Sequence, residues 1–153
     1  SPMPYPHLKS PLGHHNSPRL LKSSLYFAMV DTAQNTGMIL TIALNYGGQA
    51  EILDAVKALA MEVKQGVLSV DEITQDSFEQ RLTTAILPEA YRNPDFVIRT
   101  SGENRLSNFL PWQTAYSELY FTETLWPDFD EAALDLAFDV FSQRDRRYGG
   151  IKK

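Results

Sequence analysis

Cysteine is absent from all 153 residues of the chain, so it can form neither a disulfide nor a zinc–thiolate site. The sequence also lacks an apolar run near the roughly 20 residues that a membrane helix needs, and it shows no signal-peptide core. These absences make a reducing, cytoplasmic setting the default expectation. Basic residues are outnumbered, with 14 Lys and Arg against 19 Asp and Glu, which argues against a nucleic-acid partner. An anionic ligand would have to be held by a local cluster of basic groups.

The first 30 residues contain no acidic side chain, although they hold all three histidines. Five of the nine prolines fall within residues 1–18 and break any helix or strand pattern there. We interpret residues 1–18 as an irregular arm that is disordered or was added in cloning. A metal site on its histidines is the alternative, which the missing carboxylates disfavour. The predicted organisation is an arm at 1–18, one domain over 19–150 and a tail at 151–153.

The rest of the chain alternates helix-like and strand-like segments. The apolar run 38–44 has no polar alternation, which predicts a strand buried on both faces. Segments 96–98 and 118–121 predict two further strands. Helices are predicted over 20–35, over 49–65, over 76–87 and after Asp128. This order predicts an α/β fold, namely a partial, largely parallel β-sheet flanked by helices, with ligands at the carboxyl ends of the strands.

Helix starts and faces can also be predicted. Asp76 with Glu79, and Asp128 with Glu131, have the spacing of capping boxes. One apolar face of the 49–65 helix is expected to point to the core. Its residues are Ile52, Val56, Leu59, Ala60 and Val63.

The loop 99–108 has an unusual side-chain content. It places two arginines, three hydroxyl side chains and one glycine within ten residues. Guanidinium groups match phosphate oxygens in geometry, and hydroxyls with loop amides can complete the hydrogen bonds. The loop therefore predicts a phosphate cradle. The alternative is a solvated loop whose arginines pair with Glu103 and nearby acids.

Several motifs occur in a fixed order along the chain. They are Asn-Thr-Gly (35–37), Ala-Leu-Asn-Tyr-Gly-Gly (43–48), Asp-Phe-Val-Ile-Arg-Thr-Ser-Gly-Glu (95–103), Arg-Leu-Ser-Asn-Phe (105–109), Tyr-Ser-Glu-Leu-Tyr-Phe (116–121), Leu-Trp-Pro-Asp-Phe (125–129) and Arg-Arg-Tyr-Gly-Gly (146–150). Together they resemble the C-terminal part of the cis-prenyltransferases, whose best-known members are the undecaprenyl diphosphate synthases.

The resemblance implies a Mg²⁺-dependent transferase. Such an enzyme condenses isopentenyl diphosphate with an allylic diphosphate into a cis-polyprenyl diphosphate, an undecaprenyl-type lipid carrier, and its lipid product could bring it near a membrane. By position, Arg99, Arg105 and Ser107 should bind the diphosphate of isopentenyl diphosphate. Glu118 should act in catalysis as a magnesium ligand, with a strand-end carboxylate paired to an arginine as the alternative. Asn45 should be catalytic, unless it only forms a turn between strand and helix.

Two further expectations come from the C-terminal region. Arg147 and Gly149 resemble a motif that completes the diphosphate site of a neighbouring subunit, so the resemblance implies a homodimer or a complementing chain. The alternative is a basic cluster at the negative end of the last helix. Asp128 could cap that helix or take part in catalysis.

One family motif has no counterpart in the chain. The Asp-Gly-Asn-Gly segment, which grips the allylic diphosphate, is missing, and Asp31 is the single Asp before residue 50. Three readings follow. The chain is a fragment or truncated product that carries the isopentenyl-diphosphate half-site, or a non-catalytic subunit that donates Arg147 and Gly149, or a different phosphate-binding α/β module.

Overall fold

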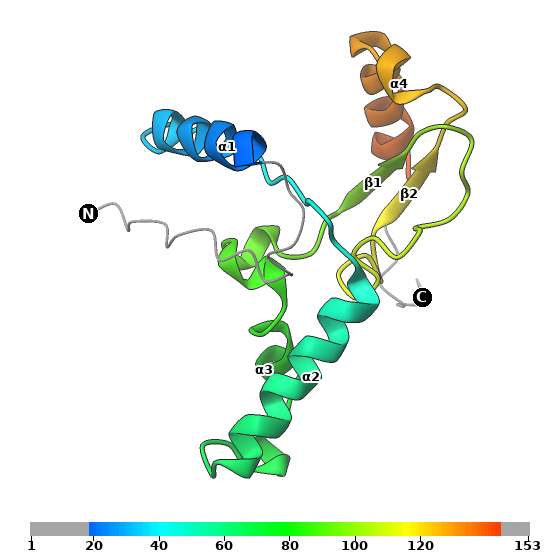
Figure 1. Cartoon of the computed structure of the whole chain (residues 1–153). Helices are drawn as coiled ribbons and strands as arrows, with labels where there is room; N and C mark the ends of the chain where they lie inside the picture. The colour runs from blue at the N-terminus through cyan, green and yellow to red at the C-terminus, as the bar shows by residue number, and fades with distance from the viewer. Residues whose placement is uncertain (1–18, 145–153) are drawn as a thin grey trace, which may run out of the picture. The chain divides into compact units, whose positions relative to one another are not determined.

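The computed structural model describes residues 19–144, with side chains from residue 26 onward. Its elements are α1 (Arg19–Thr32), α2 (Gly48–Lys64), η1 (Val70–Glu72), α3 (Gln75–Glu79), η2 (Thr83–Ile86), η3 (Glu89–Tyr91), β1 (Phe96–Arg99), β2 (Glu118–Phe121), η4 (Trp126–Asp128) and α4 (Glu131–Ser142) (Figure 1). The chain divides into two units, Ser1–Tyr46 and Gly47–Lys153, and the division falls inside the stretch 19–150 that the sequence predicts as one domain. The predicted arm and tail lie outside the described residues.

The first unit contains α1, close to the predicted helix at 20–35. The predicted strand at 38–44 is wrong, because this segment has no regular secondary structure. Its side chains are exposed rather than buried, with 87% of Met38 and 74% of Leu40 accessible to solvent. An apolar run becomes a strand only where a neighbouring strand pairs with its backbone. Residues 19–46 offer no such neighbour.

The second unit begins with α2, which ends where Gly66 adopts the left-handed φ of 71° that a helix terminator needs. The predicted apolar face is partly wrong. Leu59 is buried as expected, but Glu51 and Ala55 are the other buried side chains, and Val56 is 48% exposed. The buried face is set by the segment that packs on α2.

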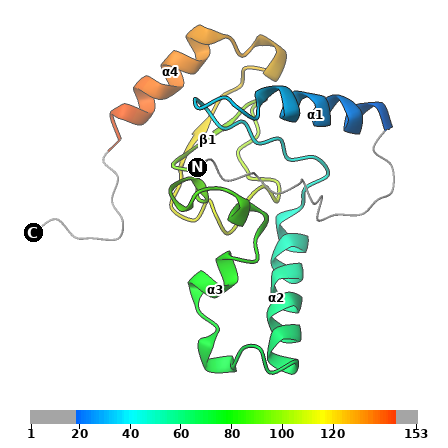
Figure 2. The ribbon, with the colours of Figure 1, turned by 90° about the vertical axis from the view of Figure 1, so that its left-hand side faces the viewer.

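That segment contains α3, which lies beside α2 in both Figure 1 and Figure 2. The apolar cluster between them contains Ala55, Leu59, Phe78 and Leu82. The predicted helix 76–87 is wrong in its extent and its cap. Thr74 is the N-cap and accepts a hydrogen bond from the Ser77 backbone N–H, 3.1 Å. The helix ends at Glu79, because the chain turns there to bury Leu82 against α2.

The two strands confirm the predictions for segments 96–98 and 118–121. They pair in parallel, with Phe96 opposite Glu118 and Arg99 opposite Phe121. Alternating side chains place Phe96, Glu118 and Tyr120 on one face of the sheet and Arg99 on the other. A small parallel sheet with helices confirms the predicted α/β class.

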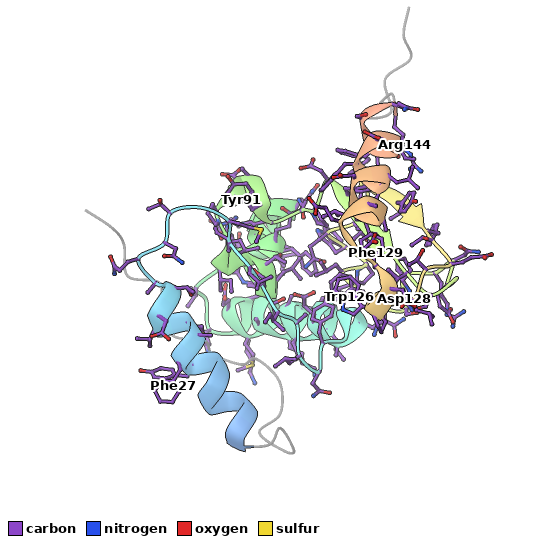
Figure 3. The ribbon with its side chains drawn as sticks, turned by 90° about the horizontal axis from the view of Figure 1, so that it is seen from above. Phe27, Tyr91, Trp126, Asp128, Phe129 and Arg144 are labelled. Atoms are coloured by element: carbon purple, nitrogen blue, oxygen red, sulfur yellow. The ribbon has the colours of Figure 1, made fainter. Side chains whose placement is uncertain are left out.

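The last helix covers the face of the sheet that carries Phe96. The Phe96 and Phe141 rings stack at 4.6 Å, and Ala137 of α4 is fully buried. The predicted cap is wrong, because the Asp130 carboxylate accepts the Ala133 backbone N–H, 2.9 Å, and Asp128 belongs to η4. Trp126 and Asp128 lie near the start of α4 and Arg144 near its end (Figure 3). Over the described range 19–144, no helix combines the length and apolarity that crossing a bilayer would require.

Candidate functional site

The arginine- and hydroxyl-rich loop 99–108 leaves the carboxyl end of β1, where α/β proteins bind ligands. Its first turn passes through Ser101 and Gly102, whose φ angles are 70° and 68°. Their backbone N–H groups donate to the carbonyls of Thr124 and Thr122, both at 2.9 Å. The segment after β2 therefore fixes the entry to the loop.

The structure brings Arg99 and Ser107 together. Arg99 Nη2 donates to Ser107 Oγ at 3.4 Å, across the opening of the loop. The Nε atom of Arg99 is buried and has no hydrogen-bond partner among the described residues. A buried guanidinium N–H without an acceptor costs free energy, and an anionic oxygen would satisfy it. This atom fits the predicted phosphate cradle.

Arg105 pairs with Glu103, as expected if the loop is a solvated one whose arginines pair with nearby acids. Its Nη2 lies 2.5 Å from Glu103 Oε2, in an ion pair whose Arg105 side chain is 69% exposed. An exposed pair of this kind contributes about 0–1 kcal/mol. The Glu103 carboxylate therefore holds Arg105 only weakly, and a diphosphate with a higher charge can compete for it.

The end of the loop is attached to α2. The carbonyl oxygen of Asn108 accepts the Gly48 N–H at 2.9 Å, and its Oδ1 accepts the Gln49 N–H at 2.8 Å. Sequence reasoning missed Asn108. The available signal was the start of α2, where Gly47 is the N-cap and has no side chain to cap the helix. A capping group had to come from elsewhere.

The residues after the loop are held by α2 and α3. Trp112 packs on Phe78 with ring centroids 4.5 Å apart, and its indole N–H donates to Glu79 Oε1 at 3.0 Å. Gln113 is 3% exposed and donates to Glu51, a buried carboxylate of α2, at 3.2 Å. The loop is thus fixed at both ends.

Glu118 lies away from Arg99 in the sheet. It lies at the amino end of β2, about 10 Å along the strand direction from the level of Arg99 and on the opposite face of the sheet. Its carboxylate pairs with Arg144 Nη1 at 2.8 Å, and the same nitrogen donates to the Leu119 carbonyl at 2.9 Å. This is the arrangement that the sequence left open as the alternative to a metal ligand.

A magnesium centre built from protein side chains alone is not present among the described residues. Within 19–144, no group of three His, Asp or Glu side chains is placed to hold a metal ion. Mg²⁺ is bound in proteins by one or two carboxylates together with substrate phosphates. Glu118 could supply one carboxylate only by leaving Arg144, and its role as a magnesium ligand stays a prediction.

The roles of the remaining predicted residues, Asn45, Arg147 and Gly149, stay predictions. Asn45 has a left-handed φ of 52° and belongs to the first unit, so its catalytic role stays a prediction. Arg147 and Gly149 lie outside the described residues.

A second feature of the unit is an apolar groove between β1 and α4. Phe96, Ile98, Phe129 and Phe138 line it together with Trp126, Asp130, Glu131 and Leu134. The rings of two of these lining residues, Trp126 and Phe129, stack with centroids 6.1 Å apart. The groove lies on the face of the sheet opposite Arg99, so it is separate from the loop.

The fold and the loop together define an α/β protein with an arginine- and hydroxyl-rich loop at the carboxyl end of a parallel strand. Residues 13–149 match the family model described as "Putative undecaprenyl diphosphate synthase". The chain therefore belongs to the undecaprenyl diphosphate synthase family, a family of prenyltransferases, which confirms the resemblance found in its motifs.

Curated relatives agree. The chain is 52% identical over 150 residues to an isoprenyl transferase of Streptococcus mutans, covering 90% of the chain and 60% of that protein. It is 51% identical over 126 residues to an isoprenyl transferase of Enterococcus faecalis, covering 82% of the chain and 46% of that protein. The chain spans about half the length of the curated relatives it matches.

Solved structures support the same fold. The lavandulyl diphosphate synthase of Lavandula x intermedia, solved with dimethylallyl diphosphate, matches with a TM-score of 0.83 and 38% identity, over 91% of this chain and 58% of that one. A probable undecaprenyl diphosphate synthase of Campylobacter jejuni matches with a TM-score of 0.67 and 26% identity, over 88% and 59% of the two chains.

Proposed function

We propose that this chain carries the isopentenyl-diphosphate half-site of a cis-prenyltransferase, which condenses that substrate with an allylic diphosphate. The product would be a cis-polyprenyl diphosphate of the undecaprenyl type. One observation carries the proposal. Arg99, at the carboxyl end of β1, has a buried Nε without a hydrogen-bond partner in the described part of the chain, while its Nη2 donates to the Ser107 hydroxyl. Membership of the family makes a diphosphate the anion that suits this donor.

The proposed roles follow from the contacts. Arg99 donates its Nε–H to a diphosphate oxygen, and the Ser107 hydroxyl, already bonded to Arg99 Nη2, adds a second donor to the same group. Arg105 leaves Glu103 and brings a second positive charge to the anion. The net-acidic chain thus binds an anion through local charge.

The reaction makes one carbon–carbon bond. The carbon–oxygen bond of the allylic diphosphate breaks, the double bond of isopentenyl diphosphate attacks the allylic carbon, and the isopentenyl unit loses a proton. Diphosphate leaves with the electron pair of the broken bond and can accept that proton. Arg99 and Ser107 act on the isopentenyl substrate by binding and orienting its diphosphate.

The same proposal includes a partner, because the allylic site would have to be completed by another chain. In the described residues the sheet has two strands that pair only with each other, which leaves their outer edges available to further strands. A homodimer or a complementing prenyltransferase chain could supply them. A prenyl-transfer assay of the chain, alone and mixed with a separately expressed N-terminal half of a relative, tests this part.

The half-site is tested by isothermal titration of isopentenyl diphosphate into the whole chain. Arg99→Gln removes the charge and the buried donor, so we expect affinity to fall about 10- to 150-fold, the size of a hydrogen bond to a charged group. Lys57→Gln is the matched control, since it removes one positive charge from an exposed side chain of α2. Its affinity should stay within about twofold. No binding at millimolar ligand, or equal affinity of Arg99→Gln and wild type, would overturn the proposal.

A further inference from the structure

Asn108 joins the candidate loop to the start of α2. It ends the loop 99–108, directly after Ser107, and its carbonyl and side-chain oxygens bind the first two backbone N–H groups of α2. These groups have no partner within a helix, because the first four N–H groups of any α-helix lack an acceptor one turn back. A residue 59 positions from Gln49 therefore supplies the cap.

The contact is close on both sides. A Cβ atom added to Gly48 would lie 2.0 Å from Pro111 Cδ and 3.0 Å from the Asn108 carbonyl oxygen, so only glycine fits there. On the loop side, Ser107 and Asn108 have φ angles of 48° and 66°, both in the left-handed region. Asn tolerates this region better than most residues, whereas Ser does not share that advantage.

The strained conformation of Ser107 therefore depends on what holds its neighbour. Ser107 itself is exposed, and its hydroxyl accepts the 3.4 Å hydrogen bond from Arg99. The Asn108 bonds to α2 are shorter, at 2.9 and 2.8 Å, and they fix the backbone one residue away. The position of the Ser107 hydroxyl thus follows the position of the α2 N-terminus.

We propose that Asn108 is a positioning residue that couples the N-terminus of α2 to the diphosphate-binding loop. Through its Oδ1 bond to the Gln49 N–H it holds Ser107 in place for the anion, and binding of the anion in turn stabilises that bond. The inference rests on the proposed function, because it assigns the loop to isopentenyl diphosphate. It adds that the two effects are reciprocal. If the Asn108–Gln49 hydrogen bond strengthens binding of the anion, then the bound anion must stabilise that hydrogen bond by the same free energy.

Asn108→Gly tests the coupling. Glycine accepts a φ of 66° without strain and keeps the carbonyl bond to Gly48, so the variant loses only the Oδ1 bond to Gln49. Affinity for isopentenyl diphosphate, measured by titration, should fall about 2- to 12-fold, the range of one neutral hydrogen bond. Asn93→Gly is the matched control, because Asn93 is exposed and precedes β1 outside the loop. Its affinity should not change.

Amide hydrogen exchange separates positioning from a purely structural cap. In the wild-type chain, saturating isopentenyl diphosphate should slow exchange of the Gln49 N–H, and in Asn108→Gly this slowing should disappear. Asn108→Asp keeps an acceptor oxygen and should retain the slowing, which provides a second variant if glycine impairs folding.

The outcomes distinguish this inference from the proposed function. If the wild-type chain does not bind isopentenyl diphosphate, both fail. If it binds, but the Gln49 exchange rate is unchanged by the ligand, or Asn108→Gly binds as tightly as wild type, the half-site stands and the coupling is overturned.

Discussion

Gly48 lies so close to Pro111 that any residue with a Cβ atom would clash there, and Gly48→Ala is the substitution that tests this. On propensity alone the change should stabilise α2, because alanine is better than glycine in a helix by about 0.5–1 kcal/mol. The contacts of Gly48 predict the opposite, namely a loss in the free energy of unfolding. The new Cβ would lie 2.0 Å from Pro111 Cδ and 2.5 Å from its Cγ, far inside van der Waals contact.

The clash cannot be relieved by rotating a flexible side chain. Pro111 has a rigid ring, and the residues that follow it, Gln113 and Thr114, are 3% and 6% exposed and anchored. Overpacking at such a site costs about 1–3 kcal/mol, and shifting Asn108 away would cost a further 0.5–1.5 kcal/mol, roughly, for each hydrogen bond lost. These costs exceed the propensity gain, so we expect a net loss of about 1–3 kcal/mol in the free energy of unfolding.

Urea unfolding, followed by circular dichroism, measures this change, and Gly47→Ala provides the control. Gly47 has an extended backbone, φ −145° and ψ 113°, and an added Cβ would meet only Asn108 Nδ2 at 3.4 Å, an ordinary contact. Its stability should stay within about 0.5 kcal/mol of wild type. The reasoning is refuted if Gly48→Ala is as stable as wild type, or if both variants lose the same free energy.

Three further predictions concern stability. Glu51→Ala should cost about 1–3 kcal/mol in urea unfolding, because Glu51 is 4% exposed and its loss leaves buried donors unpaired, whereas Glu51→Gln should cost less. Arg144→Met should lower stability by at most about 1 kcal/mol, because its ion pair with Glu118 is partly exposed, and the loss should shrink in 1 M salt. The hydrogen bond from the Ser69 backbone N–H holds the pKa of Glu72 below the usual range of a glutamate, so the stability advantage of wild type over Glu72→Gln should be present at pH 7 and vanish as the pH falls through that lowered pKa.

Local patterns predicted the parts of the fold whose cause is local. Strands β1 and β2 and helix α2 appear within two residues of their predicted bounds, because apolar runs and a terminating glycine act over a few neighbours. The segment 38–44 shows the limit of the same reasoning. Its apolar run is a strong strand signal, yet a strand needs a partner, and pairing partners are not encoded in the run itself.

The candidate site also has features that the sequence predicted and others that it could not predict. The family resemblance assigned Arg99, Arg105 and Ser107 to one diphosphate site, and the composition of the loop 99–108 predicted a phosphate cradle. Composition could not predict the Asn108 contact, which joins residues 59 positions apart, or the Arg144 partner of Glu118, 26 positions away. The parallel pairing of β1 and β2 also places Glu118 on the opposite face of the sheet from Arg99. The face on which a side chain lies is set by the register of the two strands, which local sequence does not specify.

We propose above all that the buried Nε–H of Arg99 donates a hydrogen bond to a diphosphate oxygen. The most direct measurement is the Arg99 Nε–H resonance in a ¹H–¹⁵N spectrum of the whole chain, recorded with increasing isopentenyl diphosphate and assigned with Arg99→Lys. The account predicts that this proton moves downfield and exchanges more slowly with water as the ligand saturates. An Arg99 Nε–H signal that stays unchanged at saturation, with the shifts confined to the groove around Phe96 and Phe138, would contradict it.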